Sequence, residues 1–362
     1  MTRKHYRTAA WLTAVVFAAA AFYFAVTRIS GRHGRTVELD SGYRVVMGTF
    51  ARIVAVAPDS QTAQECIEAA FEQLTFVENL CSIHREDSEI SKCNRNAYGT
   101  AVKVSAETFE VLQKALEFSR RSAGAFDITV GPLIELWRRA AEANSLPTKQ
   151  QLTDVAGRVG YDKLILDANA GSVRFAVDGM KLDLGGIAKG YAIDKAVDAM
   201  KQKAAAGGMI DVGGDIRCFG SPPGGREHWL IGLQDPARAD NALKPAEVLM
   251  QLKLPSGIGS AVTTSGDYRR FVLIEGQRYS HIINTLTGHS SEGLPSVTVI
   301  CENAADSDAL ATAVSVMGVK KGLALIEEMP QTEAILVTSG PESKQYLTSG
   351  AQNYINTESI DY

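Results

Sequence analysis

Predicted strands and helices are mixed along this chain without a regular strand–helix–strand repeat, which limits the fold classes open to it. Between residues 61 and 80, apolar side chains recur at the three- and four-residue spacing of an amphipathic helix: Ile67, Phe71, Leu74, Val77 and Leu80. Further helices are predicted from Ser105 to Gly124, over 133–143, over 187–204 and over 304–317, the last after Asn303 as N-cap and before Gly318. We therefore expect an α+β fold in a single body without internal repeats.

The β-rich segments are short and separated by glycine turns. Residues 43–57 are predicted to form two strands hinged at Gly48, residues 163–185 a β-meander, and residues 208–219 a strand interrupted by Gly213-Gly214. Further strands are predicted over 229–234, 247–253, 261–264, 269–274, 278–283 and 296–301. Because this pattern offers no clear internal boundary, the body is expected to extend from residue 43 to 340, followed by a tail over 341–362.

The N-terminus carries an apolar segment. Residues 9–27 follow a basic stretch, 1–8, and approach the roughly 20 residues that a helix needs to span a bilayer. We favour an uncleaved transmembrane anchor, while the small residues Ala18–Ala21 leave a cleaved signal peptide as the alternative. Residues 28–42 are polar and basic and are interpreted as a linker. An export segment of this kind predicts a protein of the inner (cell) membrane with its catalytic body outside the cytoplasm, in the periplasm.

Composition excludes several classes of function. The 362 residues carry a net charge of −4 with scattered Lys and Arg, so no nucleic-acid partner is expected. Five cysteines form no Cys-x-x-Cys pair, and six histidines form no His-Glu-x-x-His motif. Neither a zinc site nor a disulfide framework is indicated.

The segment Asp183-Leu-Gly-Gly-Ile-Ala-Lys-Gly runs from a strand end through a glycine pair into a helix. Gly185 and Gly186 allow a ligand to approach the backbone closely, and the helix N-terminus that follows attracts anions. Asp183 and Lys189 add one charge of each sign. The alternative is an ordinary strand–turn–helix junction. Because neither a Walker loop nor a Rossmann glycine fingerprint is present, a phosphate ligand would be held in another way.

Two later segments carry further candidate chemistry. Asp308 and Thr312 are one helical turn apart on the same face, and such an oxygen-rich pair suits Mg²⁺. The alternative for Asp308 is a partner of the helix dipole. His281 follows a predicted strand among polar residues and is a candidate proton acceptor, or else a structural histidine.

Eight short motifs follow one another along the chain: Met47-Gly48-Thr49, Asp87-Ser88-Glu89-Ile90-Ser91, Ala125-Phe126-Asp127-Ile128-Thr129, Asp183 to Ala192, Gly213-Gly214-Asp215-Ile216, Thr264-Ser265-Gly266-Asp267-Tyr268, His281-Ile282-Ile283 and Asp308 to Thr312. In this order they resemble the motifs of the ApbE family, the FAD:protein FMN transferases. The resemblance spans residues 43–340. It implies the single mixed α/β, T-fold-like body of that family and an Mg²⁺-dependent enzyme. Such an enzyme cleaves FAD, attaches FMN through a phosphoester to a threonine of a partner flavoprotein and releases AMP. Subunits of respiratory ion-pumping complexes are the acceptors that the family implies.

The resemblance also implies roles for individual residues. The FAD-contacting positions are Met47, His84, Ala125, Phe126, Asp127, Asp183, Lys189 and Ile283. The metal positions are the carbonyl groups of Gly186 and Ala311 with the side chains of Asp308 and Thr312, and His281 matches the histidine implicated in transfer.

Three positions depart from the family pattern. His84 replaces an aromatic residue that stacks on the flavin or adenine, Asn284 replaces an aspartate near His281, and Asp211 replaces an asparagine. Two alternative functions therefore accompany FMN transfer: an Mg²⁺-dependent FAD pyrophosphatase, in which water replaces the acceptor hydroxyl, and a flavin-binding protein without turnover.

Overall fold

A computed structural model describes residues 36–236, 248–255, 260–266, 271–339 and 343–357. Its centre is an eight-stranded sheet with the order β1-β2-β6-β7-β10-β13-β14-β15, in which every neighbouring pair is antiparallel. The strands are β1 (Val37–Val46), β2 (Thr49–Ala57), β6 (Gly207–Val212), β7 (Asp215–Gly220), β10 (Ser260–Gly266), β13 (Ser296–Cys301), β14 (Glu333–Val337) and β15 (Gln345–Leu347). The predicted mixture of helices and strands is thus confirmed.

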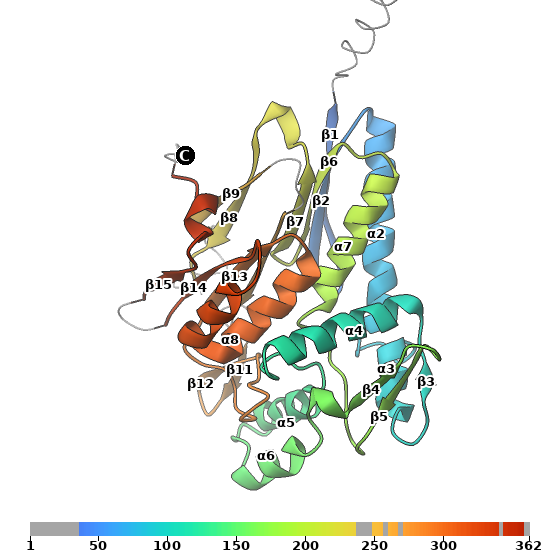
Figure 1. Cartoon of the computed structure of the whole chain (residues 1–362), viewed down its shortest axis with the longest axis vertical. Coiled ribbons are helices and arrows are strands. Elements are labelled where there is room, and N and C mark those ends of the chain that lie inside the picture. Colours follow the sequence, from blue (N-terminus) through green and yellow to red (C-terminus); the bar gives the residue numbers. More distant parts are fainter. Residues whose placement is uncertain (1–35, 237–247, 256–259, 267–270, 340–342, 358–362) are drawn as a thin grey trace, which may run out of the picture.

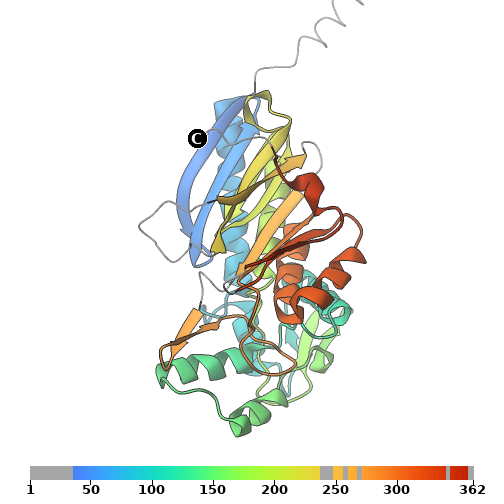
Figure 2. The same ribbon diagram turned by 90° about the vertical axis from the view of Figure 1, so that its left-hand side faces the viewer.

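Three long helices cover one face of this sheet: α2 (Ser60–Cys81), α7 (Ala188–Gln202) and α8 (Ala304–Glu327). Figure 1 shows α2 and α7 side by side to the right of β1, β2 and β6, with α8 beside β13. The hairpin of β8 (His228–Gln234) and β9 (Val248–Pro255) covers part of the opposite face (Figure 2). There Trp229, Ile231 and Leu252 pack on Val56 and Val262. The large buried core between the sheet and the helices stabilises the body through removal of apolar surface from water.

A smaller part of the molecule lies below the main sheet in Figure 1. It contains α3 (Glu89–Asn96), α4 (Ala106–Arg121), α5 (Gly131–Glu142), α6 (Lys149–Ala156), a sheet of β3 (Val102–Lys103), β5 (Ser172–Phe175) and β4 (Leu164–Asp167), and the hairpin of β11 (Phe271–Ile274) with β12 (Gln277–Ser280). Leu133, Trp137 and Ile283 form a separate apolar cluster there. The active-site candidates lie where this part meets α7 and α8.

Of the two predicted N-cap residues, Ser105 makes the expected side-chain bond and Asn303 does not. Ser105 is the N-cap of α4 and accepts from the Thr108 amide, as expected of a serine at that position. Asn303 occupies the N-cap of α8 without a side-chain cap bond. Asp194 on α7 caps α8 instead, since its carboxylate accepts from the amides of Ala304 and Ala305 at 2.8 and 3.0 Å. Helical geometry breaks at Gly318, as predicted, and then resumes to Glu327.

The structure corrects three expectations about segments. The β-meander predicted over 163–185 is wrong: within that range the structure has the strands β4 and β5, and the third strand of their sheet is β3, from earlier in the chain. The linker over 28–42 is too long, because β1 begins at Val37. The tail over 341–362 is not separate from the body, because β15 pairs with β14.

Residues 1–8 and 9–27, interpreted as a basic N-terminus and a membrane anchor, lie outside the described residues. Within the described part of the chain, α8 is the one helix long and apolar enough to cross a bilayer. It packs against β10 and β13 inside the body, which accounts for its apolar composition.

Candidate active site

The glycine turn before α7 lies directly against α8. A Cβ placed on Gly186 would stand 2.9 Å from the Thr312 hydroxyl and 3.2 Å from the Phe126 ring, so a larger side chain would force these groups apart. Gly190, the third residue of α7, approaches the Ala304 carbonyl so closely that a Cβ placed on it would be 2.2 Å from the carbonyl oxygen. The predicted glycine turn and the predicted Asp308–Thr312 pair therefore meet in one place.

Three charged side chains form a buried cluster at this junction. The Lys189 ammonium, on the first turn of α7, lies 2.7 Å from Asp215 Oδ2 and 3.6 Å from Asp308 Oδ2. Asp215 and Asp308 are 3% and 2% exposed. Burial raises the pKa of Asp308 to about 7, while the Lys189 charge lowers it and the Asp215 charge raises it. Because two carboxylates share one ammonium, the cluster favours a further positive charge.

Neutral oxygen atoms lie on α8 one turn after Asp308 and on the facing strand β10. The Thr312 hydroxyl lies 3.4 Å from Ser265 Oγ of β10, and the Ala311 carbonyl accepts from Ser315 Oγ at 2.8 Å. Asp215 Oδ2 is buried without a hydrogen-bond partner beyond its ion pair. Within the described ranges, no group of three or more His, Cys, Asp or Glu side chains is placed to hold a metal. A donor set of two carboxylates with hydroxyl and carbonyl oxygens nevertheless fits Mg²⁺, which accepts few carboxylates and hard oxygen ligands.

The α7 N-terminus was expected to receive a phosphate. In the structure, Asp308 Oδ2 accepts the Gly190 amide at 3.2 Å, so a carboxylate already occupies part of this positive helix end. The N-terminus of α7 and the Lys189 charge therefore both lower the pKa of Asp308 and favour its ionised form, whereas burial raises that pKa.

Asp127 organises the loop before α5. Its Oδ1 accepts from the amide and hydroxyl of Thr129 at 2.8 and 2.7 Å, and its Oδ2 accepts from the Tyr161 amide at 2.8 Å. Burial raises the pKa of this carboxyl, although these hydrogen bonds lower it. Ala125 and Phe126 are buried on the same loop. The site role of Asp127 is therefore to hold the loop in place.

A backbone bond joins this loop to the glycine turn: the Asp183 amide donates to the Ile128 carbonyl at 2.8 Å. Asp183 Oδ1 accepts from Gly185, and burial raises the pKa of Asp183 while the nearby His84 lowers it. His84 is exposed and near enough to Asp183 to affect the pKa of that carboxyl.

The segment after β12 reaches the same loop. His281 is exposed at the strand end and Ile283 is buried in the neighbouring apolar cluster. The Thr285 hydroxyl donates to the Gly124 carbonyl, which fixes the segment beside Ala125. Asn284 Oδ1 accepts from the amides of Leu286 and Thr287, a turn-forming role that aspartate can also fill. The replacement at 284 therefore preserves the turn.

Met47 lies in the β1–β2 turn, where it and Gly48 adopt positive φ angles of 53° and 66°, as a type I′ hairpin requires. This turn adjoins the β6–β7 turn, because the Phe50 carbonyl accepts from the Gly213 amide at 2.9 Å. Asp211 Oδ1 accepts from Gly214 in the latter turn at 2.8 Å, a bond that asparagine can also make. The Asp211 departure is thus accounted for by the turn.

Sequence reasoning missed Asp215 as a site residue. It was noted only as part of the Gly213-Gly214-Asp215 motif, whereas the structure places its carboxylate nearest to Lys189. A glycine pair followed by an acid at a strand start was the available signal. Asp267 and Tyr268, also part of the resemblance, lie outside the described residues.

The fold and the site define a mixed α/β enzyme body with a buried acid–lysine cluster suited to a cation and an anionic substrate. The sequence matches the ApbE family over residues 47–336, most of its length, and the chain belongs to that family. It is similar to the FAD:protein FMN transferase of Treponema pallidum, with 32% identity over 81% of this chain and 83% of that protein. The corresponding protein of Vibrio cholerae is 30% identical over 82% and 86%.

Solved structures agree with this assignment. The ApbE protein of Thermotoga maritima matches with a TM-score of 0.76 and 31% identity over 89% of this chain and all of that one. The flavin transferase ApbE from Vibrio cholerae matches with a TM-score of 0.74 and 27% identity over 88% and 99%. The expected ApbE-type fold is therefore confirmed.

Proposed function

We propose that this protein transfers FMN from FAD to a threonine hydroxyl of a partner flavoprotein and releases AMP, with Mg²⁺ as cofactor. The observation that carries the proposal is the meeting of Gly186, Lys189, Asp308 and Thr312 at one buried junction. Its location on an ApbE-family fold, among relatives named FAD:protein FMN transferase, supports the same reaction.

The residues that would hold Mg²⁺ are Asp308, Thr312 and the carbonyl groups of Gly186 and Ala311, with Asp215 within the same cluster. When bound, Mg²⁺ would neutralise charge on the pyrophosphate oxygens. We assign FAD contacts to Met47, His84, Ala125, Phe126 and Ile283, and to the loop and turn that Asp127 and Asp183 hold.

In the reaction, the acceptor oxygen attacks the phosphorus of the FMN half, and the bond from that phosphorus to the bridging oxygen breaks. The electron pair leaves with AMP. Lys189 supplies positive charge beside the phosphates, and His281 accepts the proton of the acceptor hydroxyl. Phosphoryl transfer depends chiefly on positioning and charge neutralisation, and these are the contributions that this cluster offers.

The acceptor hydroxyl separates transfer from hydrolysis. A pyrophosphatase would use water at the same position and release FMN and AMP without a protein. We also propose that residues 9–27 anchor the enzyme in the inner membrane with its body in the periplasm, where it would serve flavoproteins such as subunits of respiratory ion-pumping complexes.

The test incubates the purified protein with FAD, Mg²⁺ and an acceptor domain that carries the target threonine. We expect a covalently fluorescent acceptor band in a denaturing gel and stoichiometric AMP, both lost with EDTA. Asp308→Ala should reduce transfer about 100-fold or more, because it removes a carboxylate ligand of the proposed Mg²⁺ and with it the charge that would stabilise the transition state. The control is Asp306→Ala, two residues earlier on α8, where Asp306 pairs with Lys114 away from the cluster. AMP release without acceptor labelling would favour hydrolysis, and transfer undiminished by Asp308→Ala would contradict the metal assignment.

A further inference from the structure

Strand β1 forms an edge of the main sheet, and only the first half of this edge carries features that hinder pairing with a strand of another chain. Among the described residues, β1 pairs with β2 and with no other strand. Its first half carries the exposed acids Glu38 and Asp40 and a register irregularity between Asp40 and Tyr43, with Gly42 at a φ of 64°. Charged side chains and bulges are devices that keep an edge strand from pairing with other chains.

Among the described residues, the second half of β1 pairs with no strand on its outer side, and large apolar side chains are exposed there and at the adjoining start of β2. Tyr43, Val45 and Phe50 are 67%, 75% and 62% exposed, and the rings of Tyr43 and Phe50 pack edge to face at 6.5 Å. We call these three residues the hairpin patch. Large apolar side chains that gather at an exposed sheet edge are unusual unless a partner covers them.

The backbone of Val45 faces the open edge. Val46 and Thr49 flank the two-residue turn and form its hydrogen-bonded pair, so Val45 and Phe50 are a non-hydrogen-bonded pair. The Phe50 carbonyl, directed away from β1, accepts from Gly213. By the same alternation, the amide and carbonyl of Val45 point outward, where an added strand would bind them.

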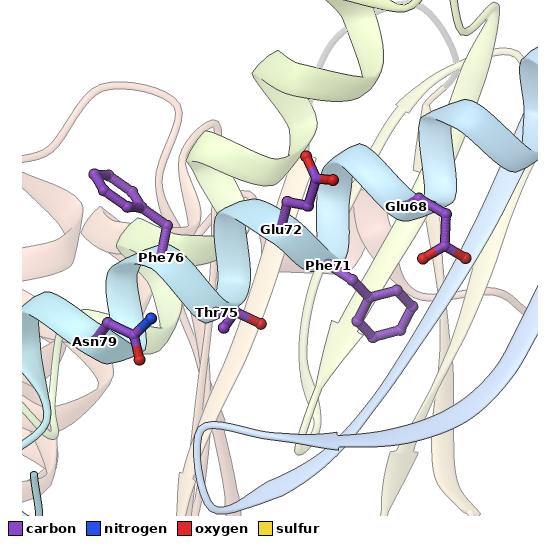
Figure 3. Close-up of a pocket in the computed structure, with 6 residues that line it drawn as sticks. All are labelled: Glu68, Phe71, Glu72, Thr75, Phe76 and Asn79. Atoms are coloured by element: carbon purple, nitrogen blue, oxygen red, sulfur yellow. The ribbon is translucent and has the colours of Figure 1, made fainter.

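A groove along α2 lies beside this edge, on the face of the sheet that the helices cover. It has a volume of about 380 Å³ and is lined by Glu68, Phe71, Glu72, Thr75, Phe76 and Asn79 (Figure 3). Arg44 of β1 stacks over the Phe71 ring at 4.3 Å and pairs with Glu68, which places the groove beside the edge strand. Phe76 is 40% exposed, and the exposed Glu72 adds negative charge.

The second half of β1 is also the half next to the active site. Phe50 bonds to Gly213, and Asp215 follows two residues later with its carboxylate on Lys189. A chain paired with Tyr43–Val46 would therefore lead toward the acid–lysine cluster. The protected half of β1 leads away from it.

We propose that the Tyr43–Val46 edge, with the hairpin patch and the α2 groove, is the docking strand for the acceptor protein. An extended acceptor segment beside the target threonine adds to the sheet at β1. Side chains alternate between the two faces of such an added strand. Those on one face are apolar and contact the hairpin patch. Those on the other face enter the α2 groove and are apolar or basic, with a basic side chain placed against Glu72. This proposal rests on the proposed function, which requires a protein substrate at this site.

Other occupants fit the edge less well. Arg44 and Arg52 are already paired with Glu68 and Asp40 at 2.7 and 2.6 Å, so they offer little to anionic lipid headgroups. Self-association through four residues of edge strand would be a short contact, whereas stable interfaces bury about 1,600 Å².

The experiment measures steady-state FMN transfer by the full-length protein to the acceptor domain, with KM values for acceptor and FAD taken separately. Val45→Pro removes the outward amide without removing a bond to β2, and Val45→Glu places a charge in the hairpin patch. We expect either change to raise KM for the acceptor at least tenfold, with kcat and the KM for FAD within twofold of wild type. The matched control is Leu230→Glu on β8, where Leu230 is 43% exposed. Circular dichroism and thermal melting verify that each variant is folded.

An unchanged acceptor KM in folded Val45→Pro and Val45→Glu would overturn the docking strand while FMN transfer itself stands. The docking strand would also be overturned if the variants kept the acceptor KM of wild type and instead abolished a dimer seen by sedimentation or weakened binding to phospholipid vesicles. Absence of transfer by wild type would instead overturn the proposed function and this proposal with it.

Discussion

The chemistry of the site depends on an imbalance among three side chains. Lys189 is shared by Asp215 and Asp308, so one negative charge is left over when both carboxyls are ionised. Burial makes such an excess costly, and the raised pKa of Asp308 expresses that cost. A bound divalent cation would more than offset this excess negative charge. The cluster would then carry net positive charge, which favours the negatively charged phosphates of a substrate.

This imbalance predicts the effect of Asp215→Asn. With one carboxylate removed, Lys189 pairs with Asp308 alone, and no excess negative charge remains to favour a cation. We expect the Mg²⁺ concentration for half-maximal transfer to rise about 10- to 100-fold, as for other residues that support a metal site. A magnesium titration of the transfer rate measures it.

Asp211→Asn is the matched control for this titration. It makes the same change four residues earlier, where the Gly214 amide can bond to an asparagine oxygen equally well. Its magnesium dependence should equal that of wild type. If Asp215→Asn also left the dependence unchanged, Asp215 would have no part in the cation site.

At the level of elements, the site is built by the crossing of α7 and α8. Gly190 permits contact with the Ala304 backbone, and Asp194 on α7 caps the α8 amides while pairing with Arg217 at 2.6 Å. Helix α7 therefore positions α8 by contacting the backbone at the N-terminus of α8. This crossing fixes how far Lys189 lies from Asp308.

Gly190→Ala tests the crossing. In a free helix this substitution would stabilise by about 1 kcal/mol, whereas here the new Cβ would stand 2.2 Å from the Ala304 carbonyl. We expect a loss of about 1–3 kcal/mol in the free energy of unfolding, measured with urea. Gly157→Ala is the control, because its Cβ would meet nothing within 4 Å. Equal stability changes in the two variants would show that the helices adjust freely.

At the scale of the whole molecule, local patterns predicted elements better than they predicted contacts. The apolar spacing of α2 and the Ser105 cap of α4 were readable because each depends on neighbours within one helix. Asp215 and the Asp194 cap were not, because their partners are on other elements. The β4–β5 sheet was mispredicted for the same reason, since its third strand, β3, comes from earlier in the chain. The site arises from tertiary contacts that one-dimensional spacing does not contain.

The junction between the N-terminal segment and the body gives the last prediction. Because β1 begins at Val37 and its hairpin buries Val46 and Ala51 in the core, we expect deletion of residues 1–35 to leave the described body folded. We expect the truncated protein to move from the membrane fraction to the soluble fraction and to retain kcat within about twofold and its melting temperature. Cell fractionation of both forms with in vitro transfer assays measures this. A wild-type protein found wholly in the soluble fraction would contradict the anchor, whereas a truncated protein with a lowered melting temperature would show that residues before Val37 stabilise the body.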